Sequence, residues 1–441
     1  MLRYLCSLAD RALAVAAGTP AGAVHLNFPF RKPLEPTIVP GDTDRSTAAG
    51  GTKDREQPQL QITSAGQAPC GEQVRAVVDA LQGSIRPLIV CGQRCAGPAF
   101  VVAVQRLAVR ARVPLLADAL SGVRFAHRPE GAADLVLGLY ENYIGSAVLP
   151  DPDLILRFGA PPISAALESL IDGTDAPQIL ISDSGVYEDP SHRLSGLFRC
   201  DPAELCDSVS VAVAANPPLD AAGWAGQWAA REARAATAIA AAFASNGVEG
   251  SVVAAVATAQ PAASPLFIAN SLPVRHLDQF AAVRTSQVPV YCNRGASGID
   301  GTISSALGVA AGSGQRVTVV LGDLAFYHDL NALLALRLCV LQAKVLEQNN
   351  DGGVIFRRMP VAEFDPILTD LFLTPHGLEF SGVAALFGLR YQLVEHIREF
   401  GDAFNAALGR SGSQLIELRT DSAAHEVVRQ RIRSALREPA L

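Results

Sequence analysis

The sequence predicts an α/β protein with two doubly wound, parallel-sheet domains. Three observations predict this fold class. Short apolar runs alternate with helical stretches twice along the chain, once on each side of a long alanine-rich segment. The 441 residues suffice for two or three domains with buried cores. Apolar residues make up 49% and charged residues 18% of the chain, which is typical of a globular protein.

Residues 1–36 predict an amphipathic helix that ends at Gly18, followed by a strand over residues 23–30. One helix and one strand cannot form a core, so we expect this piece to dock on another surface. Residues 37–68 are polar, contain glycine and lack apolar periodicity, which is typical of a linker. The N-terminus does not have the layout of a signal peptide.

Residues 69–218 form the first predicted α/β domain. Its strands are predicted at residues 86–92, 113–118, 153–159 and 178–183, with a helix after the first strand. Gly92 and Gly159 end two of these strands, and Gly97 follows closely, so a bound dinucleotide and simple tight turns are both possible interpretations. Because no G-x-G-x-x-G motif is present, tight turns in a scaffold domain are favoured.

The alanine-rich stretch within residues 219–246 predicts a long helix that connects the domains. Residues 247–441 then repeat the alternation and form the second predicted domain. Its strands are predicted at residues 265–270, 288–293, 317–323 and 413–419.

Polar clusters follow three strands of this second domain and predict a ligand site. The clusters are N-S-L-P-V-R, N-R-G-A-S-G-I-D-G and G-D-L-A-F-Y. The carboxyl ends of parallel strands meet at one sheet edge, where ligands bind in open α/β sheets. Asp323 lies at such an end, and Asn350 follows in an N-N-D-G-G stretch. A carboxylate, an amide oxygen and backbone carbonyls form the oxygen-rich set that holds Mg²⁺ against a diphosphate.

Two arginines and a glycine-rich loop add anion-binding groups to this edge. Arg275 and Arg294 follow two strand ends, where guanidinium groups suit the carboxylates of a small substrate; a surface salt bridge is the alternative for each. The loop over residues 293–308 opens a helix, whose N-terminus favours an anion. It lacks the lysine of a P-loop, which argues against an ATPase.

Composition excludes several classes of function. The net charge of −7 and the pI of about 5.7 argue against a nucleic-acid surface. No apolar run reaches the roughly 18 residues of a membrane span. The eight cysteines and eight histidines are scattered without zinc-ligand spacing, so reduced thiols and no histidine metal site are expected.

Several segments resemble one family. The G-D and N-N-x-G-G pair resembles the diphosphate and Mg²⁺ motif of thiamine-diphosphate enzymes. Other segments resemble the 2-succinyl-5-enolpyruvyl-6-hydroxy-3-cyclohexene-1-carboxylate synthases of menaquinone and phylloquinone biosynthesis, and they distinguish the chain from acetolactate synthases and pyruvate decarboxylases. These segments are V-H-L-N-F-P-F-R-K-P-L, L-L-A-D-A-L-S-G-V-R, L-I-L-R-F-G-A-P-P-I-S, N-R-G-A-S-G-I-D-G and H-G-L-E-F-S-G-V-A-A-L-F-G-L-R-Y, and together they cover nearly the whole chain.

The resemblance implies roles for individual residues. Asp323, Asn350 and the carbonyl of Gly352 would bind Mg²⁺ or Mn²⁺. Thiamine diphosphate would contact Ser271, Ser297, Gly298, Ile299, Gly322, Asp323, Leu324, Asn350 and Gly352, with Ile299 supporting the bent cofactor. The substrates would contact Arg275, Arg294, Ile355 and Phe356.

The implied reaction decarboxylates 2-oxoglutarate and adds the succinyl unit to isochorismate, with the cofactor as electron sink. A homodimer or homotetramer is implied, in the cytoplasm or, in a photosynthetic eukaryote, in a plastid. The family's activating glutamate lies in a pyrimidine-binding domain, and residues 1–36 resemble only the last part of that domain. The chain alone is therefore expected to be inactive, and no catalytic residue is assigned in it. The alternatives are a non-catalytic remnant that binds diphosphate weakly, and another thiamine-diphosphate lyase or decarboxylase.

The chain departs from the family pattern at several positions. Glu347 and Gln348 replace apolar residues in the strand expected before N-N-D-G-G, so whether that strand forms stays open. Buried polar groups without partners cost about 1–3 kcal/mol each. Asp351 replaces a neutral residue and is expected to add negative charge beside the diphosphate. Ala165 and Ala166 stand where the family has a basic pair.

Overall fold

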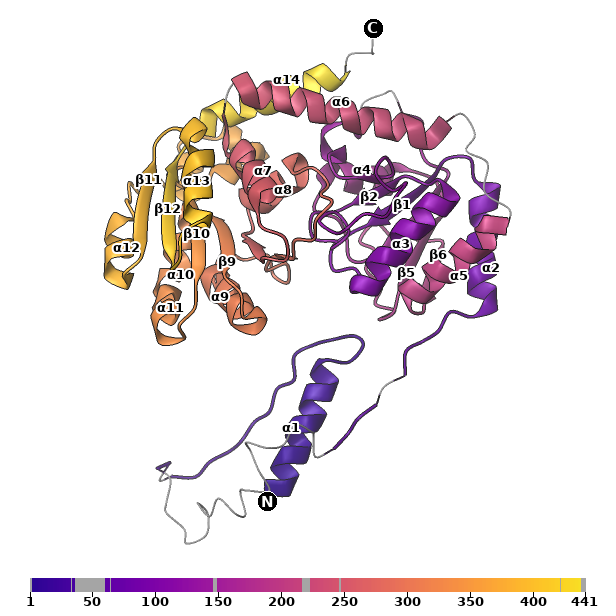
Figure 1. The fold of residues 1–441 in the computed structure, drawn as a ribbon, viewed down its shortest axis with the longest axis horizontal. Helices are drawn as coiled ribbons and strands as arrows, with labels where there is room; N and C mark the ends of the chain where they lie inside the picture. Colours follow the sequence, from indigo (N-terminus) through magenta and orange to yellow (C-terminus); the bar gives the residue numbers. More distant parts are fainter. Residues whose placement is uncertain are drawn as a thin grey trace.

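The computed structural model describes residues 2–32, 34–35, 60–63, 65–145, 149–215, 223–245, 247–420 and 422–437. Within these residues two lobes lie side by side, each built around a six-stranded parallel sheet with helices packed on it (Figure 1). The α/β fold class with two parallel-sheet units is thus confirmed. Most of the predicted linker, residues 37–59 and residue 64, lies outside the described residues, and its described remainder contains no helix or strand.

The first lobe (residues 71–215) has the strand order β3-β2-β1-β4-β5-β6. Its strands are β1 (Pro87–Cys91), β2 (Leu115–Ala117), β3 (Val136–Leu137), β4 (Leu154–Phe158), β5 (Gln178–Ser182) and β6 (Gly196–Arg199). Its helices are α2 (Gly71–Gly83), α3 (Pro98–Ala111), η1 (Tyr140–Asn142), α4 (Ala165–Gly173) and α5 (Pro202–Ala215). The direction of the strand order reverses between β1 and β4, which is the topological switch point of a doubly wound sheet. The strands β3 and β6 were not predicted.

The second lobe (residues 249–420) has the strand order β11-β12-β10-β9-β7-β8. Its strands are β7 (Leu266–Ile268), β8 (Val290–Tyr291), β9 (Val317–Gly322), β10 (Ala343–Asn349), β11 (Arg390–Val394) and β12 (Gln414–Arg419). Its helices are α7 (Glu249–Ala259), α8 (Leu272–Phe280), α9 (Thr302–Ser313), α10 (Asp323–Asp329), η3 (Leu330–Leu333), α11 (Leu334–Leu338), η4 (Val354–Arg358), η5 (Pro360–Glu363), η6 (Leu368–Leu373), α12 (Ser381–Phe387), η7 (Ile397–Glu399) and α13 (Phe400–Leu408). The chain leaves β7 toward β8 on one side and later returns to β9 on the other, so the switch point lies between β7 and β9.

The polar stretch before N-N-D-G-G does form a strand, which answers the question left open by the sequence. β10 is buried along its whole length and pairs with β9 on one side and β12 on the other. The apolar pair Val345 and Leu346 lies opposite Val319, Val320, Leu415 and Ile416 in the neighbouring strands. The backbone of β10 is therefore paired on both sides, although Glu347 and Gln348 are polar.

A long helix, α6 (Trp224–Ser245), lies within residues 219–246 and runs across the top of both lobes (Figure 1). The last helix, α14 (Ser422–Arg437), lies along it, and Val428 and Ile432 join the apolar cluster that contains Trp228. No single helix in the described ranges has the length and apolar composition of a membrane span; α6 and α7 pass together, but a bend of 116° separates them.

The strand predicted over residues 23–30 is wrong. Helix α1 (Leu2–Ala16) forms as expected, but the residues after it are exposed and form no β pairing with any described strand. A strand is stable only when its backbone groups pair with a neighbour, and apolar alternation alone does not supply that neighbour. In Figure 1, α1 lies apart from both lobes, so the expected docking is not seen within the described residues.

A buried arginine joins the two lobes and places α8. Arg124, from the first lobe, is fully buried, and its Nη1 donates to the backbone oxygens of Leu277 (3.2 Å) and Asp278 (2.8 Å). The same nitrogen lies 3.3 Å from a carboxylate oxygen of Asp278, and the guanidinium lies over the ring of Tyr140. Because α8 also carries Arg275, this junction sets the position of a predicted substrate residue.

Candidate functional site

Nearly all the predicted site residues line one cavity of about 290 Å³ at the carboxyl edge of the second sheet, beside the β7 and β9 exits. We call it the β7–β9 cavity. It is lined by Ser271, Arg275, Arg294, Ser297, Ile299, Gly322, Asp323, Leu324, Asn350, Gly352, Ile355 and Phe356, among others. Gly298 is not among its lining residues; its carbonyl instead accepts a hydrogen bond from Asn270 Nδ2 (2.7 Å). The roles of the individual residues remain predictions.

Asp323 organises the loop that closes one side of the cavity. Its side chain is almost fully buried at the start of α10, directly after β9. One carboxylate oxygen accepts from the backbone N–H of Leu324 (2.7 Å). The other accepts from the backbone N–H groups of Asn350 (3.2 Å) and Gly352 (2.9 Å). The N-N-D-G-G loop therefore folds around this carboxylate.

Two features of the loop explain its sequence. Gly352 has a φ of +131°, and a Cβ there would lie 2.0 Å from the carbonyl oxygen of Leu373, so only glycine fits. The Asp351 carboxylate accepts from the backbone N–H groups of His376 (2.9 Å) and Gly377 (2.8 Å), and these bonds lower its pKa. Asp351 faces that turn and is not among the residues lining the cavity, in contrast to the expectation that it adds charge beside a diphosphate.

Asn350 presents an unpaired oxygen in the cavity. Its Nδ2 donates to Glu249 Oε1 (2.8 Å), while its Oδ1 is buried and has no hydrogen-bond partner among the described residues. A buried amide oxygen without a partner is costly, so a ligand is expected to satisfy it. An amide oxygen beside a carboxylate suits a hard divalent cation, and the residues present therefore fit Mg²⁺.

Arg294 is held by both lobes. Its Nη1 donates to Asn270 Oδ1 (2.8 Å) at the exit of β7, and its Nε donates to Gln93 Oε1 (3.1 Å) at the exit of β1. Gln93 Nε2 donates in turn to the backbone oxygen of Pro161 (2.8 Å), so its oxygen must face Arg294. Asn270 also donates to the backbone oxygen of Asn293 (2.6 Å), which holds the glycine-rich loop against β7.

Arg275 lies at the same cavity and forms one hydrogen bond with the described part of the chain. Its Nη1 donates to the backbone oxygen of Ser271 (2.8 Å), a residue held at a φ of +70° between β7 and α8. Burial lowers the pKa of Arg275, and the nearby Arg294 lowers it further. Neither arginine forms an ion pair with a carboxylate in the described part of the chain, so the alternative of a surface salt bridge is not observed. Two cationic groups at one cavity favour an anionic ligand.

The two polar residues of β10 have different environments. Glu347 is fully buried, and neither of its carboxylate oxygens has a hydrogen-bond partner among the described residues. Burial, followed by the charges of Asp323 and Glu417, raises the pKa of Glu347 well above its ordinary value. Gln348, on the opposite face of the strand, lines the β7–β9 cavity. The expected burial of unpaired polar atoms therefore holds for Glu347.

Three residues at or beside the cavity were given no individual role by the sequence: Asn270 and Glu249, which line it, and His376, which does not. Asn270 begins the N-S-L-P-V-R cluster directly after β7, so its place at a strand exit was a usable signal. Glu249 begins α7, far from any motif, and burial raises the pKa of its carboxyl group while bonds from Thr420 and Asn350 lower it. His376 Nε2 lies 3.2 Å from a carboxylate oxygen of Asp323, and its position in H-G-L-E-F was noted only as a resemblance.

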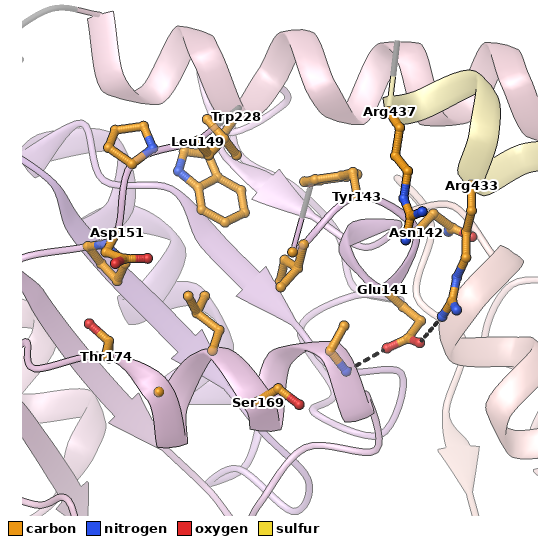
Figure 2. Close-up of a pocket in the computed structure, with 17 residues that line it drawn as sticks. Glu141, Asn142, Tyr143, Leu149, Asp151, Ser169, Thr174, Trp228, Arg433 and Arg437 are labelled. Carbon is orange, nitrogen blue, oxygen red and sulfur yellow. Dashed lines mark hydrogen bonds and ion pairs between the residues drawn. The ribbon is translucent and has the colours of Figure 1, made fainter. Parts of the chain in front are cut away.

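A larger cavity, of about 600 Å³, lies between the first lobe and the helices α6 and α14 and contains none of the predicted site residues (Figure 2). Its principal carboxylate is already paired. Glu141 contacts Arg433 (3.3 Å) through one oxygen, and the other accepts from Ser164 Oγ (2.6 Å) and the backbone N–H of Ala166 (3.1 Å). Ala166, one of the two positions where the resemblance implies a basic pair, thus lies at this cavity's wall.

Sequence comparison gives one consistent result. No family model matches the chain. The chain is 40% identical to a 2-succinyl-5-enolpyruvyl-6-hydroxy-3-cyclohexene-1-carboxylate synthase of Roseiflexus castenholzii, over 99% of this chain and 74% of that protein. It is 37% identical to the protein of the same name from Halobacterium salinarum, over 98% and 74%. The corresponding figures for the Bacillus velezensis protein of that name are 33%, 99% and 74%.

Proposed function

This chain belongs to the family of 2-succinyl-5-enolpyruvyl-6-hydroxy-3-cyclohexene-1-carboxylate synthases, and from that membership we propose its substrates and cofactors. Members of the family are transferase-type enzymes of menaquinone synthesis. We propose that the chain takes part in decarboxylating 2-oxoglutarate and transferring the succinyl unit to isochorismate. The β7–β9 cavity would bind thiamine diphosphate with Mg²⁺ or Mn²⁺.

One observation carries this proposal: Asn350 Oδ1 is buried without a hydrogen-bond partner among the described residues, at the cavity that the buried Asp323 also lines. In the proposed site, Asp323, Asn350 and the carbonyl of Gly352 hold the metal, which neutralises a diphosphate. Ser271, Ser297, Gly298, Gly322 and Leu324 are the further cofactor contacts that the resemblance implies.

The chain's own residues then bind and orient the substrates. Arg275 and Arg294 supply guanidinium donors for substrate carboxylates, and Gln93 and Asn270 hold Arg294 in place. Ile299, Ile355 and Phe356 supply the apolar wall that excludes water. When bound, the cofactor supplies the electron sink for decarboxylation and carbon–carbon bond formation.

Titration calorimetry with thiamine diphosphate tests the site. We expect binding that requires Mg²⁺ and is lost by about 100-fold or more in Asp323→Ala, because the only carboxylate of the metal set is removed. Glu363→Ala is the matched control, since Glu363 is exposed and does not line the cavity. Unchanged affinity in Asp323→Ala would show that the cavity is not the cofactor site.

A product assay tests the reaction. The purified chain is given the cofactor, Mg²⁺ and either 2-oxoglutarate with isochorismate or pyruvate alone, and products are followed by mass spectrometry. Because the chain alone is expected to be inactive, the proposal expects no product from pyruvate, and any turnover of the first pair should give the succinyl adduct. Turnover of pyruvate alone would assign the chain to another thiamine-diphosphate lyase or decarboxylase.

We also propose a homodimer or homotetramer in the cytoplasm, or in a plastid if the source is a photosynthetic eukaryote. Exposed apolar side chains support a subunit contact on this segment: Met359 lines the cavity, and Phe364 and Ile367 follow it in the chain. Light scattering coupled to size-exclusion chromatography measures the oligomeric state, and a monomer at all concentrations would contradict it.

A further inference from the structure

We propose that Glu249 is a positioning residue that turns the Asn350 amide so that its oxygen is presented to the divalent cation. Glu249 belongs to no motif in the sequence and has no assigned role. The proposal rests on the proposed function, because it concerns the metal side of the β7–β9 cavity.

The contact between Glu249 and Asn350 decides which end of the amide faces the cavity. Glu249 is 3% exposed, and its Oε1 accepts from Asn350 Nδ2 at 2.8 Å. Glu249 Oε1 accepts from both Asn350 Nδ2 and Thr420 Oγ1, so the NH₂ end of the amide, which carries the donors, faces it. The Oδ1 end must then point away from Glu249, and it is this atom that is buried without a partner among the described residues.

Asn350 cannot select this orientation without a partner. The two ends of an amide are nearly equal in size, so packing alone does not distinguish them. The backbone of Asn350 is held by Asp323, which accepts its N–H, but that bond leaves the amide free to turn. Among the described residues, the hydrogen bond of the amide goes to Glu249, and this bond favours the orientation with the NH₂ group toward Glu249 and the oxygen away from it.

Glu249 is itself held in place from two strand exits. Thr420, which follows β12, donates from Oγ1 to the same Oε1 at 2.5 Å. Gln348, at the end of β10, lies 3.4 Å from the backbone oxygen of Glu249 through its Nε2. The start of α7 is therefore hydrogen-bonded to the edge of the sheet from which Asn350 emerges. Because Glu249 is fixed in this way, it can fix the orientation of the Asn350 amide.

Metal binding tests the proposal without relying on catalysis. The probe is Mn²⁺ in the presence of saturating thiamine diphosphate, with free Mn²⁺ measured by electron paramagnetic resonance. Partners that orient metal ligands typically contribute about 10–100-fold to metal affinity. We expect Glu249→Ala to weaken Mn²⁺ binding by about 10-fold or more, and Glu249→Gln, which keeps an acceptor oxygen, to recover most of that loss.

Thr420→Val is the matched control. It removes a hydrogen bond to the same carboxylate oxygen but leaves the bond from Asn350 intact, so we expect Mn²⁺ affinity to change by less than about threefold. A double-mutant cycle adds a second check: in an Asn350→Ala background, Glu249→Ala should have no further effect, because its target is gone.

The outcomes separate the two proposals. If Glu249→Ala binds Mn²⁺ as tightly as the unmodified chain while Asp323→Ala does not bind, the role of Glu249 is refuted and the cofactor site stands. If Asp323→Ala also binds normally, the proposed function itself fails. If Glu249→Ala does not fold, as judged by circular dichroism, Glu249→Met fills a similar volume without an acceptor, and the same comparison applies to it.

Discussion

The two lobes share an architecture but use its switch point in opposite ways. In the first lobe, the exits of β1 and β4 are joined by backbone: Gln93 N–H donates to Ala160 O (3.1 Å), and Ala160 N–H donates to Gln93 O (2.7 Å). A Cβ on Gly92 would lie 1.8 Å from Ala160 O. In the second lobe, the exits of β7 and β9 instead enclose the cavity lined by Asp323 and Asn350.

This difference indicates that the strand order creates a crevice at each switch point, and that the residues at the strand exits determine whether a ligand can enter it. The glycines at the ends of β1 and β4 permit a close approach that leaves no space there for a nucleotide. The favoured interpretation of Gly92 and Gly159 as tight turns agrees with this geometry. The closed switch point of the first lobe still contributes to the β7–β9 cavity, because Gln93 at the exit of β1 accepts a hydrogen bond from Arg294.

The largest change in stability is expected from Gly92→Ala in the first lobe. The added methyl group would collide with the Ala160 carbonyl, so the exits of β1 and β4 must move apart, which lowers the unfolding free energy by about 3 kcal/mol. Urea denaturation measures this cost. Gly83→Ala is the control, since among the described residues nothing lies within 4 Å of a Cβ there, and little change is expected. Equal stabilities would mean that the closure is looser than the structure indicates.

A smaller effect, in the opposite direction, is expected from Glu347→Leu in the second lobe. The buried carboxyl group has no partner among the described residues, whereas the first lobe's central strand β1 is wholly apolar. Replacing an unsatisfied buried polar group by an apolar one of similar shape should raise the unfolding free energy by about 1–3 kcal/mol at neutral pH. A loss of stability would show that Glu347 has an essential partner.

The same residue predicts a pH dependence. Because the pKa of Glu347 is raised in the folded chain, the folded state keeps a proton that the unfolded chain releases above the ordinary carboxyl pKa. The unfolding free energy should therefore fall as pH rises from the ordinary pKa toward the raised one, by at most about 1.4 kcal/mol per pH unit. Glu347→Gln should remove this slope while keeping a buried polar group, which separates charge from polarity.

The smallest effect is expected from Gln93→Met, which keeps the side-chain length but removes the acceptor for Arg294 Nε. We expect a roughly fivefold weaker affinity for 2-oxoglutarate, equivalent to about 1 kcal/mol for one hydrogen bond, with little change in stability. Calorimetry with the cofactor-loaded chain measures it. Gln93→Glu keeps an acceptor and should bind at least as well as the unmodified chain; similar losses in both variants would argue that Gln93 only packs.

Much of the fold was predictable because its signals are local. The apolar runs that became β1, β4, β5 and β9 have strand composition whatever surrounds them. The strand β3 was missed because only two residues carry its signal, and β11 because it contains polar residues and is mostly not buried. The prediction of a strand over residues 23–30 failed for the opposite reason, since the segment has a strand pattern but pairs with no strand among the described residues.

By itself, the sequence determined the two parallel sheets and the residues at the β7, β9 and β10 exits, because a strand and the residues that follow it are adjacent in the sequence. Only the tertiary structure decided that one switch point closes and the other stays open. Only it brought Gln93 to Arg294 and Glu249 to Asn350. These pairs come from parts of the chain distant in sequence, and their contact depends on how the lobes and the sheet edges pack.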